Sequence, residues 1–109
     1  MIKLFIKPLS VNKAWQGKRF KTNDYKKYEE DLLLMLPKIK IINPPYRLNI
    51  TVGFSSKASD LDNVLKPFLD ILQKKYDIND KHIQVLHVEK QIVTKNNEFI
   101  YFELLNIKK

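Results

Sequence analysis

The chain has 109 residues, of which 44% are hydrophobic and 29% charged, and this predicts one globular domain over residues 1–109 rather than a disordered chain. The absence of cysteine excludes disulfides, thiolate metal sites and a cysteine nucleophile. The net charge of +8 is typical of a domain that binds nucleic acid or an anionic membrane surface. A lysine-rich composition can also simply reflect a biased genome.

The first part of the chain predicts a strand, an arm and a helix. Residues 2–7 begin with apolar and polar side chains in alternation and predict a strand, and residues 8–21 predict a loop or a short irregular arm. A helix is expected from a cap at Thr22 or Asn23 to about Leu36. Its apolar positions recur at helical spacing, and they are Tyr25, Tyr28, Leu32 and Met35.

Residues 46–54 predict the clearest strand, because apolar and polar side chains alternate along it. A second helix is expected to follow and to end near Lys75. Pro67 lies inside that segment, and proline is tolerated best in the first turn of a helix, so the helix is expected to start late, with Asp62 or Asn63 near its N-cap. The predicted apolar stripe of this helix consists of Leu61, Leu65, Phe68 and Leu72.

The last part of the chain predicts two strands, at residues 83–94 and 98–107, joined as a hairpin by the Lys-Asn-Asn tip at residues 95–97. The order of elements is strand, helix, strand, helix, strand, strand, with no repeat and no domain boundary. The predicted fold class is α/β (α+β), a single domain with a small mixed β-sheet of about four strands and two main helices.

A cluster of carboxylates stands out in this basic chain. Asp60 and Asp62 fall where a strand is followed by a helix, and Asp80 falls in a loop that leads into the next strand. Lys66 lies one turn beyond Asp62 on the same helix face. A fold that brought both loops together would make one site of three carboxylates beside a lysine. Such a site suits Mg²⁺ and a phosphate ester, so the pattern predicts phosphodiester hydrolysis.

The same residues also allow a purely structural interpretation. Asp60 and Asp62 are suitable helix caps, and Asp80 is a suitable turn residue. Asp62 and Lys66 are spaced for an i,i+4 ion pair. A haloacid-dehalogenase phosphatase motif is disfavoured, because residues 55–59 are polar where that motif needs a buried strand. An EF-hand loop is excluded, because the sixth position lacks glycine and the twelfth lacks glutamate.

Three segments extend the pattern over most of the chain. Residues 60–72 read Asp-Leu-Asp-Asn-Val-Leu-Lys-Pro-Phe-Leu-Asp-Ile-Leu, residues 78–83 read Ile-Asn-Asp-Lys-His-Ile, and residues 8–15 read Pro-Leu-Ser-Val-Asn-Lys-Ala-Trp. Together they resemble the RusA family of Holliday-junction endonucleases, with its Asp-x-Asp-Asn-x-x-Lys helix, its Asp-Asp-x-x-[Val/Ile] strand opening and its Pro-x-Ser-x-Asn-x-x-aromatic start. Lys90 falls where that family often has a lysine.

The resemblance implies a homodimeric enzyme that nicks two strands of a four-way DNA junction symmetrically in recombination and repair. It implies Mg²⁺ as the cofactor, with Mn²⁺ able to substitute, and no small-molecule cofactor. The catalytic and metal-binding carboxylates would be Asp60, Asp62 and Asp80, and the essential lysine would be Lys66. Asn79 departs from the family by replacing the first acid of the Asp-Asp pair, and we expect activity to survive because Asp80 is the expected ligand. The alternatives are a catalytically inactive, structure-selective DNA-binding protein on the same scaffold and, more weakly, a small phosphatase.

Candidate DNA contacts are the basic residues Lys13, Lys18, Arg19 and Lys57. Trp15 and Phe20 could stack on unpaired bases, although anchoring the arm to the sheet is the plainer role. Asp70 is expected to pair with Lys66 rather than to bind metal. No apolar run approaches the roughly 18 residues of a membrane span, and residues 1–8 lack the features of a signal peptide, so a cytoplasmic (intracellular) location without a membrane partner is expected.

Overall fold

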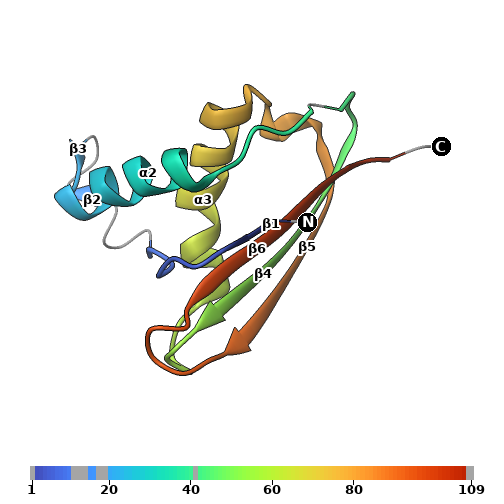
Figure 1. Cartoon of the computed structure of the whole chain (residues 1–109). Coiled ribbons are helices and arrows are strands. Elements are labelled where there is room, and N and C mark those ends of the chain that lie inside the picture. Colours follow the sequence, from blue (N-terminus) through green and yellow to red (C-terminus); the bar gives the residue numbers. More distant parts are fainter. Residues whose placement is uncertain (1, 11–14, 17–19, 41, 108–109) are drawn as a thin grey trace.

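The computed structural model describes residues 2–10, 15–16, 20–40 and 42–107, which form one α+β domain (Figure 1). A four-stranded sheet carries two helices, as the sequence predicts. The elements in chain order are β1 (Ile2–Leu4), β2 (Trp15–Gln16), β3 (Phe20–Lys21), α2 (Asn23–Met35), β4 (Tyr46–Phe54), α3 (Leu61–Tyr76), the 3₁₀ helix η1 (Asp80–His82), β5 (Ile83–Ile92) and β6 (Phe99–Asn106).

Helix α2 begins and ends close to the predicted positions, but the last residue of its buried stripe differs from the prediction. Thr22 is the N-cap, and its Oγ1 accepts a hydrogen bond from the Tyr25 backbone N–H at 3.1 Å. This bond satisfies one of the amides that a helix start leaves unpaired. Leu36 is 3% exposed, whereas the predicted core residue Met35 is 39% exposed. The backbone becomes extended at Leu36, so this side chain, and not Met35, continues the buried stripe.

Strand β4 is the centre of the sheet, whose strand order is β1-β6-β4-β5. Strand β5 runs parallel to β4, and β6 runs antiparallel to both β4 and β1. The predicted mixed sheet of four strands is thereby confirmed. The side chains of β4 that face the helices are buried, and they are Leu48, Ile50, Val52 and Phe54.

The predicted hairpin between the last two strands is wrong, because β4 lies between β5 and β6. Helix α3 carries the chain back from the end of β4 to the start of β5, which is the connection that a parallel pair requires. Residues 93–98 then pass beyond the end of β4, where the Val93 N–H donates to the Phe54 carbonyl at 2.7 Å. Asn96 has a φ of 75°, so the Asn-rich tip turns the chain, but the turn belongs to a connection that skips one strand.

Helix α3 begins earlier than predicted, because Asp60, and not Asp62 or Asn63, is its N-cap. Pro67 therefore lies inside the helix, where its missing N–H leaves the Asn63 carbonyl without the usual helical donor. The Pro67 ring is fully buried. Burial of this ring in a long amphipathic helix offsets the lost hydrogen bond, and this is why the proline does not delay the helix start.

The buried stripe of α3 is rotated relative to the predicted one. Phe68 and Leu72 are buried as predicted, whereas Leu61 and Leu65 are only partly buried at its edge. Phe68 packs edge-to-face on Phe102 of β6, with ring centroids 5.7 Å apart. The remaining buried residues of the helix are Val64, Pro67, Ile71 and Tyr76.

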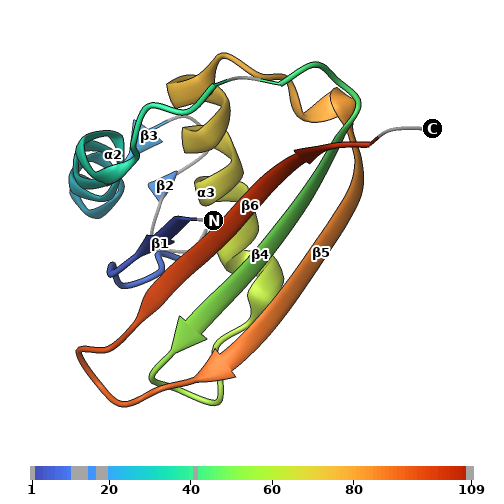
Figure 2. The same ribbon diagram turned by 45° about the vertical axis from the view of Figure 1, so that its right-hand side comes forward.

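Both helices pack on the same face of the sheet (Figure 2). Lys74 of α3 reaches Glu29 of α2 with a Nζ–Oε1 distance of 3.1 Å, and the Lys75 ammonium donates to the Leu33 carbonyl at 3.0 Å. Figure 2 turns the opposite face of β4, β5 and β6 toward the viewer, and no described helix crosses it. Within the described ranges, the helices are too short or too polar to cross a lipid bilayer.

Candidate functional site

Asp60 is the N-cap of α3, but its side chain does not cap the helix. Its backbone is extended, with φ of −101° and ψ of 132°, and its carboxylate accepts no hydrogen bond from an amide of the first turn. A capping aspartate normally accepts a bond from the N–H two or three positions further on. The Asp60 Oδ2 instead accepts a long hydrogen bond of 3.5 Å from Asn63 Nδ2. The Asp60 carboxylate is exposed and available to a ligand.

Asp62 and Lys66 follow on the exposed surface of the same helix. The Lys66 ammonium lies 3.7 Å from the Asp70 carboxylate one turn on, so the expected Lys66–Asp70 pair is confirmed. Lys66 is 66% exposed, and a pair so accessible to water is worth only about 0.3–0.5 kcal/mol. Asp62 has no hydrogen-bond or ion-pair partner among the described residues, so its carboxylate is also available.

Asp80 opens η1, which follows the end of α3. Its backbone N–H donates to the Gln73 side-chain oxygen at 3.0 Å, and its carboxylate is exposed. Asn79 is the N-cap of η1, and its Oδ1 accepts a hydrogen bond from the Lys81 N–H at 3.0 Å. Asn79, the residue that departs from the RusA pattern, therefore stabilises the turn that presents Asp80.

One chain does not bring the three predicted carboxylates together. Asp60 and Asp62 lie at the start of α3, and Asp80 lies beyond its end (Figure 1). The 16 residues of α3, at about 1.5 Å each, hold these groups roughly 24 Å apart. Within the described ranges, no three side chains of histidine, cysteine, aspartate or glutamate lie close enough to hold a metal ion. We call Asp60 and Asp62 the loop half-site, and Asp80 the turn half-site.

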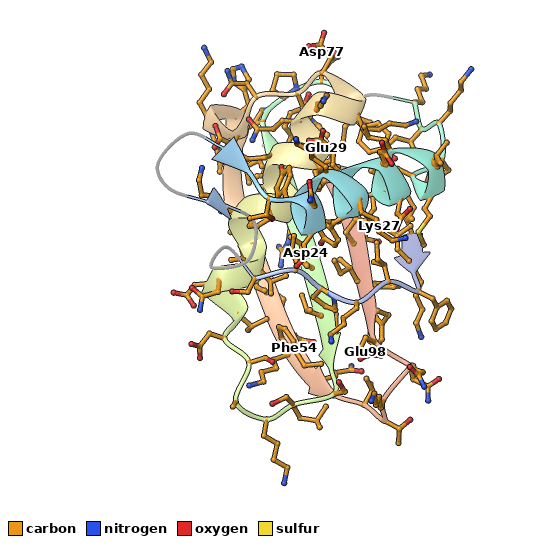
Figure 3. The ribbon with its side chains drawn as sticks, turned by 90° about the vertical axis from the view of Figure 1, so that its left-hand side faces the viewer. Asp24, Lys27, Glu29, Phe54, Asp77 and Glu98 are labelled. Atoms are coloured by element: carbon orange, nitrogen blue, oxygen red, sulfur yellow. The ribbon has the colours of Figure 1, made fainter. Side chains whose placement is uncertain are left out.

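A groove of about 810 Å³ borders the loop half-site on the side of α2. Asp60 and Asn63 line it, whereas Asp62 and Lys66 do not. Figure 3 views this side of the molecule, with Asp24 and Lys27 of α2 and with Phe54 and Glu98 at the end of the sheet, and all four also line the groove. Carboxylates outnumber lysines along it, so the groove as a whole does not favour a phosphate.

Glu98 and Lys90 make contacts that the sequence does not predict. The Ser55 hydroxyl donates to Glu98 Oε2 at 3.0 Å, although the two residues lie 43 positions apart. The Lys90 ammonium donates to the Lys57 carbonyl at 2.8 Å and to the Ser59 carbonyl at 2.6 Å. The sequence signal for Lys90 is its match to a lysine of the RusA pattern, and the structure places it opposite the buried Val52 of β4.

The predicted DNA contacts Lys13, Lys18 and Arg19 lie outside the described residues, as do the side chains of Trp15 and Phe20. Lys57 is exposed in the loop that precedes Asp60. Two further exposed lysines, Lys26 and Lys27, lie on α2.

Strand β5 is an exposed edge of the sheet, and its residues are all exposed or only partly buried. The apolar side chains of Val85, Leu86 and Ile92 are 38%, 44% and 47% exposed. An edge strand presents unpaired N–H and C=O groups that can pair with a strand of another chain.

No protein-family model matches the chain, and no curated protein sequence matches it.

Proposed function

We propose that the protein is a Mg²⁺-dependent, structure-selective endodeoxyribonuclease that resolves four-way DNA junctions in recombination and repair, with Mn²⁺ able to substitute. The observation that carries this proposal is the Asp60 carboxylate, which stands at a helix N-terminus without capping it. That position weakens the purely structural interpretation of the Asp-x-Asp motif. The similarity of residues 60–72 and 78–83 to the RusA pattern supplies the reaction class.

The donor set at the loop half-site fits the proposed cation. Asp60 and Asp62 offer exposed carboxylate oxygens, which are the ligands that Mg²⁺ prefers. When bound, Mg²⁺ would polarise the phosphate and lower the pKa of a coordinated water. Lys66 is 66% exposed, and in the proposed mechanism its ammonium would leave Asp70 and neutralise charge on a phosphoryl oxygen. Breaking its pair with Asp70 costs little, because the pair is exposed.

The proposal includes a homodimer, because one chain separates its two half-sites. Strand β5 starts next to Asp80 and ends next to Lys90, which contacts the loop before Asp60. Antiparallel pairing of β5 with β5 of a second copy, about a twofold axis, would bring the turn half-site of one chain to the loop half-site of the other. Two equivalent sites of three carboxylates would result, which matches two symmetric nicks.

The net charge of +8 supports a polyanionic partner, and a cytoplasmic (intracellular) location is part of the proposal. Contacts with the phosphate backbone depend on released counterions, so junction binding is expected to weaken steeply as salt is raised. Affinity that stays constant between low and moderate salt would argue against the basic surface as the binding element.

The central test is the cleavage of a synthetic four-way junction with and without Mg²⁺, beside linear duplex of the same sequence. The parent protein is expected to make paired nicks in the junction only. Asp62→Asn is expected to bind the junction at least as tightly, since it removes a negative charge, and to cut none of it. Asp77→Asn is the matched control, because Asp77 is an exposed carboxylate in a left-handed turn that asparagine tolerates, and this variant should cut normally.

Two outcomes would count against the nuclease. Cutting by Asp62→Asn would exclude the loop half-site as the metal ligand. Junction binding by the parent protein without any cutting would favour the inactive DNA-binding protein instead.

A further inference from the structure

We propose that Lys90 is a positioning residue that holds the backbone in front of Asp60, an inference that rests on the proposed nuclease function. The ammonium of Lys90 donates to two backbone carbonyls, at Lys57 (2.8 Å) and Ser59 (2.6 Å). Both distances are as short as those of charge-assisted hydrogen bonds. The second carbonyl belongs to Ser59, the residue immediately before Asp60, so Lys90 holds the backbone segment that leads into the loop half-site.

The place of Lys90 in the fold argues against an incidental surface contact. It opposes Val52 across the β4–β5 pair and therefore points toward the helix side of the sheet. Its ammonium passes over the Phe54 ring, 5.6 Å from the ring centroid, on the way to the loop. A cation over an aromatic face is favourable by about 0.5–1 kcal/mol at exposed sites, so the ring guides the side chain in the same direction.

The loop has few bonds of its own with which to hold this shape. The Ser59 N–H donates to the Ser56 carbonyl at a long 3.4 Å, and the Ala58 N–H donates to the Ser56 hydroxyl at 3.2 Å. Residues 55–58 are all exposed. Removal of the two bonds from Lys90 would leave the segment before Asp60 with these weak contacts, and the Asp60 carboxylate would lose its fixed position.

The two possible roles of Lys90, as a nearby positive charge or as a residue that holds the loop, predict opposite changes in Mg²⁺ affinity when it is removed. If Lys90 acted only as a nearby positive charge, its removal would strengthen Mg²⁺ binding, because repulsion of the cation would fall. If Lys90 holds the loop, its removal would weaken Mg²⁺ binding, because the ligands must be ordered on binding. Mutation of a residue that holds a metal ligand in position typically lowers the metal affinity by about 10–100-fold.

The test compares ¹⁵N relaxation and Mg²⁺ titration in four proteins: the parent, Lys90→Met, Lys90→Arg and Lys95→Met. Methionine keeps the length of the side chain and removes its donors, and arginine keeps the charge and donors. Lys95 is the matched control, since its ammonium has no hydrogen-bond or ion-pair partner among the described residues. Amide order parameters for residues 57–60 report the loop directly, and amide shifts of residues 60–63 report Mg²⁺ binding without any DNA.

In Lys90→Met, the order parameters are expected to fall from the rigid level of about 0.85 toward 0.6, and the Mg²⁺ dissociation constant is expected to rise at least 10-fold. Lys90→Arg should restore both quantities in large part, and Lys95→Met should match the parent. Unchanged loop order, or tighter Mg²⁺ binding, in Lys90→Met would overturn the proposal. If the loop responds as expected but the parent cuts no junction, the positioning role stands and the proposed nuclease function fails.

Discussion

Glu98 is a carboxylate of 9% exposure next to the start of β6, and it links that strand to the end of β4. Hydrogen bonds from its own backbone N–H and from the Ser55 hydroxyl stabilise the charged form and lower its pKa below the usual range. Because the pKa is lower in the folded protein, this contribution to stability is present above the unfolded pKa and is lost as the pH falls through the folded pKa.

Glu98→Gln is therefore expected to lower the free energy of unfolding at neutral pH. The difference from the parent should shrink as the pH falls below the ordinary range of a glutamate, since the parent then loses the same charged bonds. Urea unfolding at a series of pH values measures this difference. Glu30→Gln, an exposed carboxylate on α2, is the control. A difference that stays constant across the pH series would contradict the charge-based explanation.

The predictability of single residues depends on how local their contacts are. Thr22 was identifiable as a cap because its partner lies three positions further on. Lys66 was expected to pair with Asp70 for the same reason, and the two side chains do meet. The contacts of Lys90 and Glu98 bridge more than 30 positions, and no local pattern encodes them.

Among the strands, β4 contains a glycine whose substitution tests the packing of the open face. Gly53 lies directly opposite Phe99 of β6, and a Cβ added to Gly53 would overlap the Phe99 ring. Phe99 is only 7% exposed, and the Lys3 ammonium lies 4.5 Å from its centroid. The Phe99 ring therefore covers Gly53, and the Lys3 ammonium lies against the ring.

Gly53→Ala is expected to destabilise the protein by about 1 kcal/mol. Overpacking against the ring costs about 1–3 kcal/mol. Alanine regains roughly 0.5–1 kcal/mol of backbone entropy relative to glycine. Chemical unfolding of Gly53→Ala, Phe99→Ala and the double variant measures the coupling. In the Phe99→Ala background the added methyl should cost nothing, and an undiminished cost there would show that the overlap with Phe99 is not the cause.

At the scale of elements, sequence periodicity predicts which segments form helices and strands better than it predicts how they pair. The alternation in residues 46–54 correctly predicts β4, because burial on one face repeats every second residue. The hairpin between β5 and β6 was wrong because pairing depends on the α3 crossover, which places β5 beside β4. The start of α3 was wrong because a buried Pro67 is tolerated inside that helix.

At the scale of the whole molecule, α3 separates the candidate site into two halves. The motifs identify the candidate residues, and their positions in space depend on the sheet. A right-handed crossover places the start and the end of α3 at opposite ends of the sheet (Figure 1). The length of the predicted helix, which ends near Lys75, already implies a separation of roughly 20 Å at about 1.5 Å per residue, so a single chain could not have joined the two loops. If the proposed function is correct, neither half-site can act alone, and activity becomes a property of two chains.

Mixed dimers test this division directly. Asp62→Asn and Asp80→Asn are each expected to be inactive alone. If the half-sites combine between chains, a dimer with one copy of each variant has one site with both defects and one intact site. An equal mixture contains about half mixed dimers, so nicking should recover to roughly a quarter of the parent rate, with single rather than paired nicks. Junction cleavage after joint refolding of the two variants measures this recovery.

The control for this experiment is a mixture of Asp60→Asn and Asp62→Asn. Both changes lie in the loop half-site, so every site in their mixed dimers carries one defect and nothing should recover. Recovery in the first mixture and none in the control would require Asp80 to act on the partner's loop. The first mixture could also be inactive while sedimentation shows that it still forms dimers. Each chain would then have to carry its own complete site. In that case the separation of roughly 24 Å along α3, at about 1.5 Å per residue, would have to close when DNA binds.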